Sequence, residues 1–373
     1  MHSFTLSRPQ IVGIISALFA EELSRNVRRH VDAATAAAWG EEKEFGPPGI
    51  GLSEEELSLC AERVAAFFGI ADQRPQLSLS DTIGGLASLI TNALHTKLEA
   101  FAFTPAGDER NCVHRADQIF ADAAAAANLF HGRRRFLSLV APHSLLGFAL
   151  TILTPNLQRL ECVDTRALTP QMLGDTLAFG DVLIATPTSW RYILQQGVAA
   201  PDNVMGAFFG EPMSAELSNE MRQAGFGAQR EIYGSTETGL IGWRDSPTDP
   251  FVLFDHWRRD DRGLRRQPLS DDGEAVTPMD RLEWESDRRF HLGGRRDGAV
   301  QIGAINVFPA RIAEILSGHD LVDQSVIKVG RHSGGVNRLI AHIKLIDPAP
   351  PSEGTVRAID RWCRKNTRPL LRP

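Results

Sequence analysis

From residue 100 onward, short apolar runs alternate with segments of helical spacing, and this alternation is the feature that most constrains the fold. Each apolar run is bounded by glycine, proline or aspartate, and the runs are AFAF, RFLSLVAP, LECVD, DVLIATP and GAFFG. Strands that alternate with helices in this way are typical of a sheet with parallel or mixed strands. The sequence therefore predicts an α/β fold with a large domain of mixed sheets and helices.

The two ends of the chain have different patterns. Residues 1–98 are predicted to form a mostly helical prefix, in which Ser53 caps an amphipathic run with an acidic first turn. After Gly294, strand-like and helical segments alternate over a short distance, which predicts a small, shortened C-terminal α+β domain. We therefore predict a large domain at 1–294 and a C-terminal domain at 295–373.

Composition excludes several classes of protein. Acidic residues (46) outnumber basic residues (40), so a nucleic-acid partner is disfavoured. The four cysteines stand far apart and no histidines pair at metal-ligand spacing, so neither a disulfide framework nor a zinc site is predicted. The longest apolar stretch is interrupted by Pro142, His143 and Gly147, and the first residues lack the pattern of an export signal. A cytoplasmic protein without a membrane span is therefore expected.

The segment EIYGSTETG, residues 231–239, carries the clearest chemical pattern in the chain. It combines an aromatic ring, a glycine, three aliphatic hydroxyl groups and the carboxylate of Glu237. Such a loop offers backbone N–H groups and hydroxyls to a phosphate, and Glu237 is suited to hold a divalent cation. A polar turn after a strand is the alternative interpretation of the same residues.

This stretch resembles the Tyr-Gly-x-Thr-Glu motif of the adenylate-forming superfamily, which comprises acyl- and aryl-CoA synthetases, peptide-synthetase adenylation domains and luciferases. Other landmarks of that superfamily follow in the same order. APHSLLGF at 141–148 resembles the stretch beside the acyl pocket, TPTSW at 186–190 a Pro-Thr strand end, and GEP at 210–212 the segment against adenine. Asp280 is similar to the aspartate that binds the ribose, and the segment GRRDGAVQIGAINVFPARIAEIL, which contains Arg295, resembles the hinge motif.

The resemblance implies a role for each matching residue. Thr236 and Glu237 are implied to be catalytic, with Glu237 binding Mg²⁺, and Asp297 is implied to be the hinge of the C-terminal domain. The residues implied to bind the nucleotide are Thr104, Gly107, Gly210, Glu211, Pro212, Tyr233, Gly234, Ser235, Asp280 and Arg295. The acyl pocket is implied to include His143, Gly147, Trp190 and Phe209, which suit a flat ring, whereas Phe148 and Phe208 are interpreted as core residues.

Two departures from the superfamily pattern bear on the mechanism. The expected phosphate loop reads FTPAGDERNCVH, with Asp108 and Glu109 in place of hydroxyls and Arg110 as its one basic side chain, and no lysine occurs between residues 98 and 327. The sequence also stops at RPLLRP, before the segment that carries the adenylation lysine of the superfamily. Loss of one cationic donor costs about 2–4 kcal/mol of transition-state stabilisation, which slows adenylation without abolishing it.

The resemblance therefore predicts ATP- and Mg²⁺-dependent activation of an aromatic carboxylic acid as an acyl adenylate. The acyl group would pass to CoA, to a phosphopantetheine thiol of a carrier protein, or to a partner reductase. The overall pattern is similar to shortened adenylating proteins of phenazine antibiotic biosynthesis. A catalytically weak protein that presents an aryl acid or adenylate to a partner, and an acyl-protein synthetase that loads Cys363, are the alternatives. For residues 1–98, covering the acyl pocket and mediating a homodimer both remain open.

Overall fold

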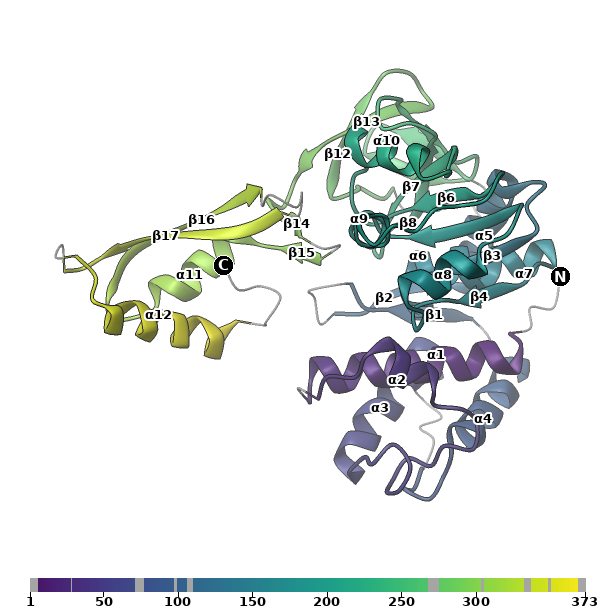
Figure 1. The fold of residues 1–373 in the computed structure, drawn as a ribbon, viewed down its shortest axis with the longest axis horizontal. Helices are drawn as coiled ribbons and strands as arrows, with labels where there is room; N and C mark the ends of the chain where they lie inside the picture. Colours follow the sequence, from purple (N-terminus) through teal and green to yellow (C-terminus); the bar gives the residue numbers. More distant parts are fainter. Residues whose placement is uncertain are drawn as a thin grey trace. The chain divides into compact units, whose positions relative to one another are not determined.

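The computed structural model describes residues 6–27, 29–70, 77–96, 99–105, 110–267, 275–302, 305–331, 337–347 and 350–367. The chain forms two compact units (Figure 1). The first unit is Met1–Val276 with Glu285–Arg289, and the second is Thr277–Trp284 with Phe290–Pro373. The functional boundary at residue 294 stays a prediction. Among the described residues, every helix falls short of the length or the apolar character that a bilayer span requires.

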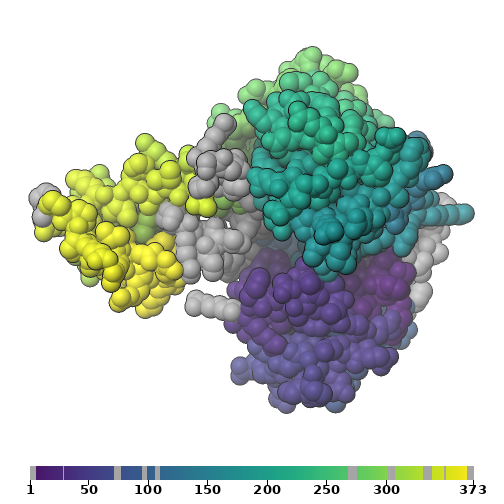
Figure 2. Space-filling view, viewed as in Figure 1, coloured from purple at the N-terminus to yellow at the C-terminus, as the bar shows by residue number. Residues whose placement is uncertain are grey.

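The helical prefix opens the first unit. Its helices are α1 (Arg8–Arg25), α2 (Ala33–Ala37), α3 (Glu54–Phe67) and α4 (Ile83–Thr96). Capping boxes begin α1 and α3, because the side chains of Ser7 and Ser53 each accept a hydrogen bond from a backbone N–H in the first turn. Helix α1 packs against the other three helices, and the space-filling view shows the prefix in purple directly against the teal part of the same unit (Figure 2).

A mixed sheet forms the centre of the first unit, as the alternation of apolar runs predicts. Its strands lie in the order β9-β8-β7-β6-β5-β3-β4. The strands are β3 (Arg135–Ser138), β4 (Cys162–Asp164), β5 (Asp181–Ala185), β6 (Met205–Phe208), β7 (Ala228–Ser235), β8 (Gly239–Arg244) and β9 (Phe251–Leu253). Neighbours from β4 to β7 run parallel, whereas β7, β8 and β9 are antiparallel. The switch in direction occurs at the loop between β7 and β8.

Helices and two hairpins surround this sheet. The hairpins are β1 (Ala100–Phe103) with β2 (Cys112–Arg115), and β10 (Trp257–Asp260) with β11 (Gly263–Arg266). The helices are α5 (Ala116–Ala127), η2 (Asn128–Phe130), α6 (Leu145–Gly147), η3 (Phe148–Leu153), α7 (Thr154–Gln158), α8 (Pro170–Thr176), α9 (Pro187–Gln195) and α10 (Ala215–Gln223). Threonine or serine caps α8, α9 and α10, and proline opens α8 and α9, so each of these three starts is encoded locally.

An aromatic cluster joins the prefix to the rest of the first unit. The ring of Phe148 lies 5.6 Å from that of Phe67 on α3, and 4.8 and 5.9 Å from those of Phe101 and Phe103 on β1. All four side chains are fully buried. The interpretation of Phe148 as a core residue is thus confirmed, and the prefix shares a hydrophobic core with the sheet-bearing part.

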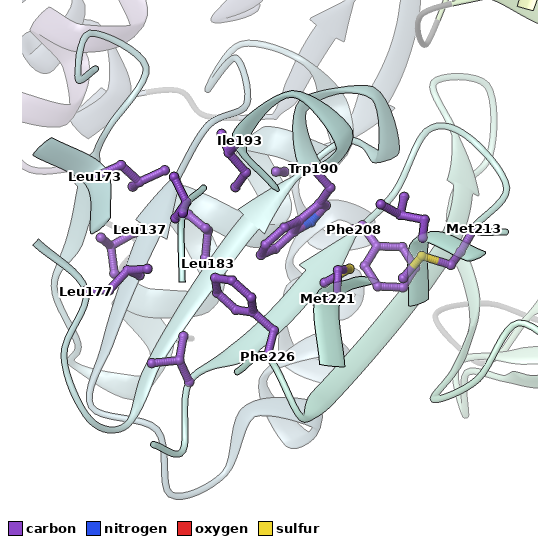
Figure 3. Packing of buried hydrophobic residues seen from close by; sticks show 14 residues of the cluster. Leu137, Leu173, Leu177, Leu183, Trp190, Ile193, Phe208, Met213, Met221 and Phe226 are labelled. Atoms are coloured by element: carbon purple, nitrogen blue, oxygen red, sulfur yellow. The ribbon is translucent and has the colours of Figure 1, made fainter. Parts of the chain in front are cut away.

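A second cluster contains Trp190, whose ring is fully buried (Figure 3). The indole N–H donates to the carbonyl oxygen of Ala207 at 3.2 Å, and the ring lies edge-on to Phe226 at 4.7 Å. Phe208 belongs to the same cluster, which confirms its interpretation as core. A Cβ atom on Gly206 would lie only 3.1 Å from the ring of Trp190, so the indole fills the space over β6.

The second unit is a small α+β assembly, as predicted. Its elements are β12 (Asp280–Trp284), β13 (Arg289–Arg295), β14 (Val300–Ile302), β15 (Ile305–Val307), α11 (Pro309–Ser317), β16 (Val322–Arg331), β17 (Asn337–Leu345) and α12 (Glu353–Asn366). Strands β14 and β15 form the expected hairpin, and β16 pairs with β17. Cys363 is buried in the core of this unit beside Ile312 and Ile359. That burial argues against the alternative in which its thiol accepts an acyl group.

Replacement of Trp190 by alanine is expected to lower the free energy of unfolding by about 3–5 kcal/mol, because it leaves a cavity in a closed cluster. Urea denaturation measures this change. Tyr192, on the same helix but 55% exposed, provides the control, and Tyr192→Ala is expected to cost less than about 0.5 kcal/mol. Equal losses in the two variants would contradict the assignment of Trp190 to the core.

Candidate active site

The EIYGSTETG segment covers the end of β7, a tight turn and the start of β8. The pairing of the two strands shifts register between Tyr233 and Gly234, which marks a bulge just before the turn. A Cβ atom on Gly234 would lie 2.3 Å from the carbonyl oxygen of Gly239, so a larger residue cannot occupy this position without displacing the backbone. Tyr233 is buried beneath the turn and Glu237 is exposed at its tip.

The turn is closed by its own hydroxyl groups. Ser235 Oγ lies 3.0 Å from Thr238 Oγ1, and the backbone N–H of Thr238 donates to the carbonyl of Ser235 at 3.3 Å. By contrast, the hydroxyl of Thr236 and the carboxylate of Glu237 make no hydrogen bond within the part of the chain that the structure describes. The two residues implied to be catalytic therefore have side chains that are available to a ligand.

A buried carboxylate, Asp122 on α5, supports the turn from beneath. Its oxygens accept hydrogen bonds from the backbone N–H of Leu240 at 2.8 Å, from Nη1 of Arg266 at 2.7 Å and from Nε2 of His256 at 3.0 Å. Arg266 also donates through Nη2 to the carbonyl of Thr238 at 2.9 Å. The ion pair of Asp122 and Arg266 thus connects the turn to α5 and β11, and the side chain of Asp122 is fully buried.

The hydrogen bonds keep this buried carboxylate ionised. Burial raises the pKa of Asp122, but hydrogen bonds and charge from His256 and Arg266 outweigh that effect, and the net result is a pKa below the ordinary value. A carboxylate that accepts several hydrogen bonds from charged donors is favoured in this way. The negative charge therefore persists beneath the turn at neutral pH.

His114 connects the turn to the hairpin that carries the expected phosphate loop. It lies on β2, and its Nε2 is 2.7 Å from the carbonyl oxygen of Thr236. Burial is the main cause of a lowered pKa at His114, so the ring is neutral at pH 7 and Nε2 must hold the proton that it donates to this carbonyl. The hairpin and the turn between β7 and β8 are thereby brought together.

The expected phosphate loop connects β1 to β2. The hydroxyl of Thr104 donates to Oδ1 of Asn111 at 2.6 Å, which closes the base of the loop. Gly107, together with Asp108 and Glu109, lies outside the described residues. Thr104 directly follows Phe103, which pairs with Cys112 on β2. Strand β2 also carries His114, which contacts the turn between β7 and β8.

The segments that resemble the adenine region also meet. The single O–H of Thr188 donates to the carboxylate of Glu211, whose two oxygens lie 2.7 and 3.0 Å from it, and this carboxylate lies 3.8 Å from Nη1 of Arg191. Gly210 has a φ of +90°, a conformation that favours glycine, and Pro212 is exposed. The Pro-Thr strand end and the Gly-Glu-Pro segment therefore form one polar rim beyond β5 and β6.

Three further predicted residues lie in the second unit. Asp280 on β12 is paired in register with Arg295 on β13. Arg295 donates to both carboxylate oxygens of Asp297, at 2.9 and 2.6 Å, and this pairing is the first cause of a lowered pKa at Asp297. Arg295 thus pairs through its backbone with the strand of Asp280 and through its side chain with Asp297.

The four residues implied to line an acyl pocket have different surroundings. Nε2 of His143 lies 3.2 Å from the carboxylate of Glu21, and Phe209 is buried at the end of β6. At Gly147, a Cβ atom would lie 2.1 Å from the carbonyl oxygen of Ala141, so only glycine fits this turn. Trp190 belongs to the closed core described above. Its lack of exposed surface argues against the predicted contribution of Trp190 to a ligand pocket.

Sequence reasoning missed the supporting residues Asp122, Arg266, His256 and His114. One signal was present for Asp122, because an acidic residue occurs at helical spacing from Ile119 and Ala126 on the buried face of α5. A carboxylate on an apolar face implies a buried cationic partner. Nothing local in the arginine-rich stretch 245–290 distinguishes Arg266 as that partner.

The donor set at the turn fits magnesium rather than a transition metal. No group of three or more histidine, cysteine, aspartate or glutamate side chains converges on a metal position among the residues that the structure describes. Mg²⁺ is commonly held by one or two carboxylates together with substrate phosphates, and the exposed carboxylate of Glu237 is suited to that arrangement.

The chain is similar in sequence to curated proteins named as ligases. No protein-family model matches the chain. A curated protein named 4-coumarate–CoA ligase from Halorhodospira halophila is 29% identical over 295 residues, which cover 78% of this chain and 74% of that protein. Another of the same name, from Cereibacter sphaeroides, is 28% identical over 317 residues, which cover 82% of this chain and 74% of that protein.

Solved structures share the fold. The amide bond synthetase McbA from Marinactinospora thermotolerans matches with a TM-score of 0.59 and 15% identity, over 94% of this chain and 87% of that chain. The o-succinylbenzoate CoA synthetase MenE from Bacillus subtilis matches with a TM-score of 0.57 and 14% identity, over 74% of this chain and 63%, less than two thirds, of that chain.

The fold is therefore that of adenylate-forming synthetases, and the sequence is similar to CoA ligases of that superfamily. The expected similarity to the superfamily is confirmed, as is the expected similarity to acid–CoA ligases.

Replacement of Asp122 by asparagine is expected to lower the free energy of unfolding by about 3–5 kcal/mol, because Arg266 would remain buried without its counter-charge. Urea denaturation at pH 7 measures the change. Asp117 lies on the same helix and pairs with the exposed Arg115, so Asp117→Asn is expected to cost less than about 1 kcal/mol.

The same pair makes stability depend on pH. Since the pKa of Asp122 is lower in the folded protein, its contribution is fully present above the ordinary value of 3.8 and is lost as the pH falls through the folded value. The wild type should therefore lose more stability than Asp122→Asn when the pH is lowered below 3.8. Parallel losses would contradict the assignment.

Replacement of Arg295 by glutamine is expected to raise the pKa of Asp297 toward its ordinary value of 3.8, because the charged donor is removed while the N–H of Ala299 remains. Carboxyl-detected NMR titration measures this pKa. Arg296, an exposed neighbour, is the control, and Arg296→Gln should leave the pKa of Asp297 lower than in Arg295→Gln.

Proposed function

We propose that the protein activates an aromatic carboxylic acid as an acyl adenylate and transfers the acyl group to CoA. The observation that carries this proposal is the turn between β7 and β8, on which the side chains of Thr236 and Glu237 are available above a buried ionic support. The support fixes the position of both residues without using their functional groups. Preorganised polar groups of this kind stabilise charge that develops during a reaction.

The reaction proceeds by attack of a carboxylate oxygen of the acid on the α-phosphorus of ATP. A bond forms between that oxygen and the phosphorus, the bond from the phosphorus to the oxygen that bridges to the β-phosphate breaks, and pyrophosphate leaves with the electron pair. The hydroxyl and backbone N–H of Thr236 would bind phosphate oxygens, and Glu237 would hold a magnesium ion, which would supply positive charge to those oxygens. A CoA thiolate then attacks the acyl carbon and releases AMP.

The roles proposed for the other site residues rest on where these residues lie in the fold and in the motifs. Glu211, held by Thr188, lies in the segment that resembles the adenine site, and Asp280 resembles the ribose ligand. The hydroxyl of Thr104 is proposed to face the triphosphate from the base of its loop. Asp297 is proposed as the hinge, because Arg295 fixes its carboxylate at the start of the segment that follows β13.

The aromatic substrate and the CoA acceptor are proposed because the curated relatives carry the name 4-coumarate–CoA ligase. A place in phenazine-type antibiotic biosynthesis rests on the sequence resemblance alone. Transfer to a carrier-protein phosphopantetheine or to a partner reductase is the alternative fate of the adenylate. A protein that binds the acid without activating it is favoured by one feature, the absence of lysine from residue 98 to residue 327.

Exchange of labelled pyrophosphate into ATP, measured across a panel of aromatic and fatty acids, tests the proposal. The wild type should exchange with at least one aryl acid, and Glu237→Gln should reduce the rate by about 10²–10³-fold, as expected for loss of one electrostatic contact to the reacting phosphate. Glu220→Gln, an exposed carboxylate on α10, is the control. Absence of exchange with every acid, together with calorimetric binding of one of them, would establish the binding protein instead.

A further inference from the structure

A second buried ionic group lies where the prefix meets the segment APHSLLGF. Its centre is the carboxylate of Glu21 on α1. Oε1 accepts from Nη2 of Arg25 at 2.7 Å, while Oε2 lies 3.2 Å from Nε2 of His143 and 3.5 Å from Nη2 of Arg63 on α3. Three basic side chains from α1, α3 and the start of the APHSLLGF segment thus converge on one carboxylate.

This carboxylate leaves several buried nitrogen atoms around it without a partner. Nε and Nη1 of Arg63 and Nδ1 of His143 are buried and have no hydrogen-bond partner among the described residues. The exposed fractions are 9% for Arg63 and 11% for the side chain of His143, so bulk water does not surround these atoms. Buried donors without acceptors are costly, and a charged guanidinium most of all.

The charges around Arg63 point to an anion as the missing partner. Glu21 stays ionised, because its hydrogen bond with His143 and the charges of His143, Arg25 and Arg63 outweigh the effect of burial and hold its pKa at about 2. That single charge is shared by Arg25 and Arg63, and its contact with Arg63 is the longer one. Glu22, the other acidic residue near Arg63, is buried and its carboxylate accepts from the side chain of Asn26.

We propose that Arg63 and His143 form a binding subsite for a second carboxylate on the acyl substrate, so that the preferred acid is an aromatic dicarboxylate. The subsite rests on the proposed function, because His143 lies in the segment that resembles the wall of the acyl pocket. Arg63 Nε and Nη1 supply charge-assisted donors, and Nδ1 of His143 supplies another when the imidazole carries both protons. Glu21 orients both side chains and leaves those atoms for the ligand.

This subsite also gives the prefix a role in substrate choice. Arg63 and Glu21 belong to residues 1–98, and their partner His143 belongs to the sheet-bearing part of the same unit. The prefix would thus complete the acyl pocket instead of merely covering it.

Calorimetric titration without ATP tests the subsite with matched probes, isophthalate and terephthalate against benzoate. The wild type should bind at least one dicarboxylate about tenfold more tightly than benzoate, which is the effect of one additional charged hydrogen-bonded contact. Arg63→Met should remove this preference, so that the dicarboxylates bind no more tightly than benzoate. Arg25→Met removes one positive charge beside Glu21 but none of the atoms without a partner. This variant should therefore keep the preference for a dicarboxylate.

Arg63→Lys covers the case in which Arg63→Met fails to fold, as judged by thermal unfolding. It keeps the charge but lacks Nε and Nη1, and should weaken the preference. A wild type that binds benzoate as tightly as both dicarboxylates, or an Arg63→Lys variant with an unchanged preference, would overturn the subsite. A preference for a dicarboxylate without pyrophosphate exchange would support the subsite and contradict the proposed function. Pyrophosphate exchange without that preference would support the proposed function and contradict the subsite.

Discussion

The ion pair between Asp122 and Arg266 is the interaction on which the candidate active site depends. Without it, the backbone N–H of Leu240 and the carbonyl of Thr238, in and just after the turn between β7 and β8, would lose their buried partners. A buried charge pair is favourable only when its remaining hydrogen-bonding capacity is used, and here His256 and the backbone use it. The sheet positions the turn, while this pair holds its shape.

The pair also constrains which residues the turn can contain. Gly239 has a φ of +83°, and a Cβ atom there would lie 2.2 Å from Oδ2 of Asp122 and 2.6 Å from Nη2 of Arg266. Glycine is therefore required both by the backbone conformation and by the close approach of the charged groups. On the opposite strand, Gly234 is required by contact with the backbone of Gly239. The turn and its support fit together only with both glycines.

Patterns of neighbouring residues in the sequence predicted the features of the fold and of the site that form within short segments. The alternation after residue 100 predicted the mixed sheet, and the residues of the EIYGSTETG segment predicted a turn with available hydroxyl and carboxylate groups. The support was not predictable in this way, since Asp122 bonds to partners 118 and 144 residues further along the chain. Trp190 shows the opposite difficulty, because an aromatic residue after a strand suits either a pocket or the core, and only packing against α10 and β6 distinguishes them.

The same long separations determine when the site can form. Asp122 lies on α5, yet its charged partner Arg266 lies on a hairpin that is synthesised much later. Contacts between distant residues form late because closing a long loop costs conformational entropy before the contact stabilises it. On the ribosome, the helices of the prefix and the first parallel strands have emerged before residue 266 is added. The turn between β7 and β8 therefore gains its hydrogen bond from Arg266 only after β11 has been synthesised, and until then Asp122 lacks the cation that allows its burial.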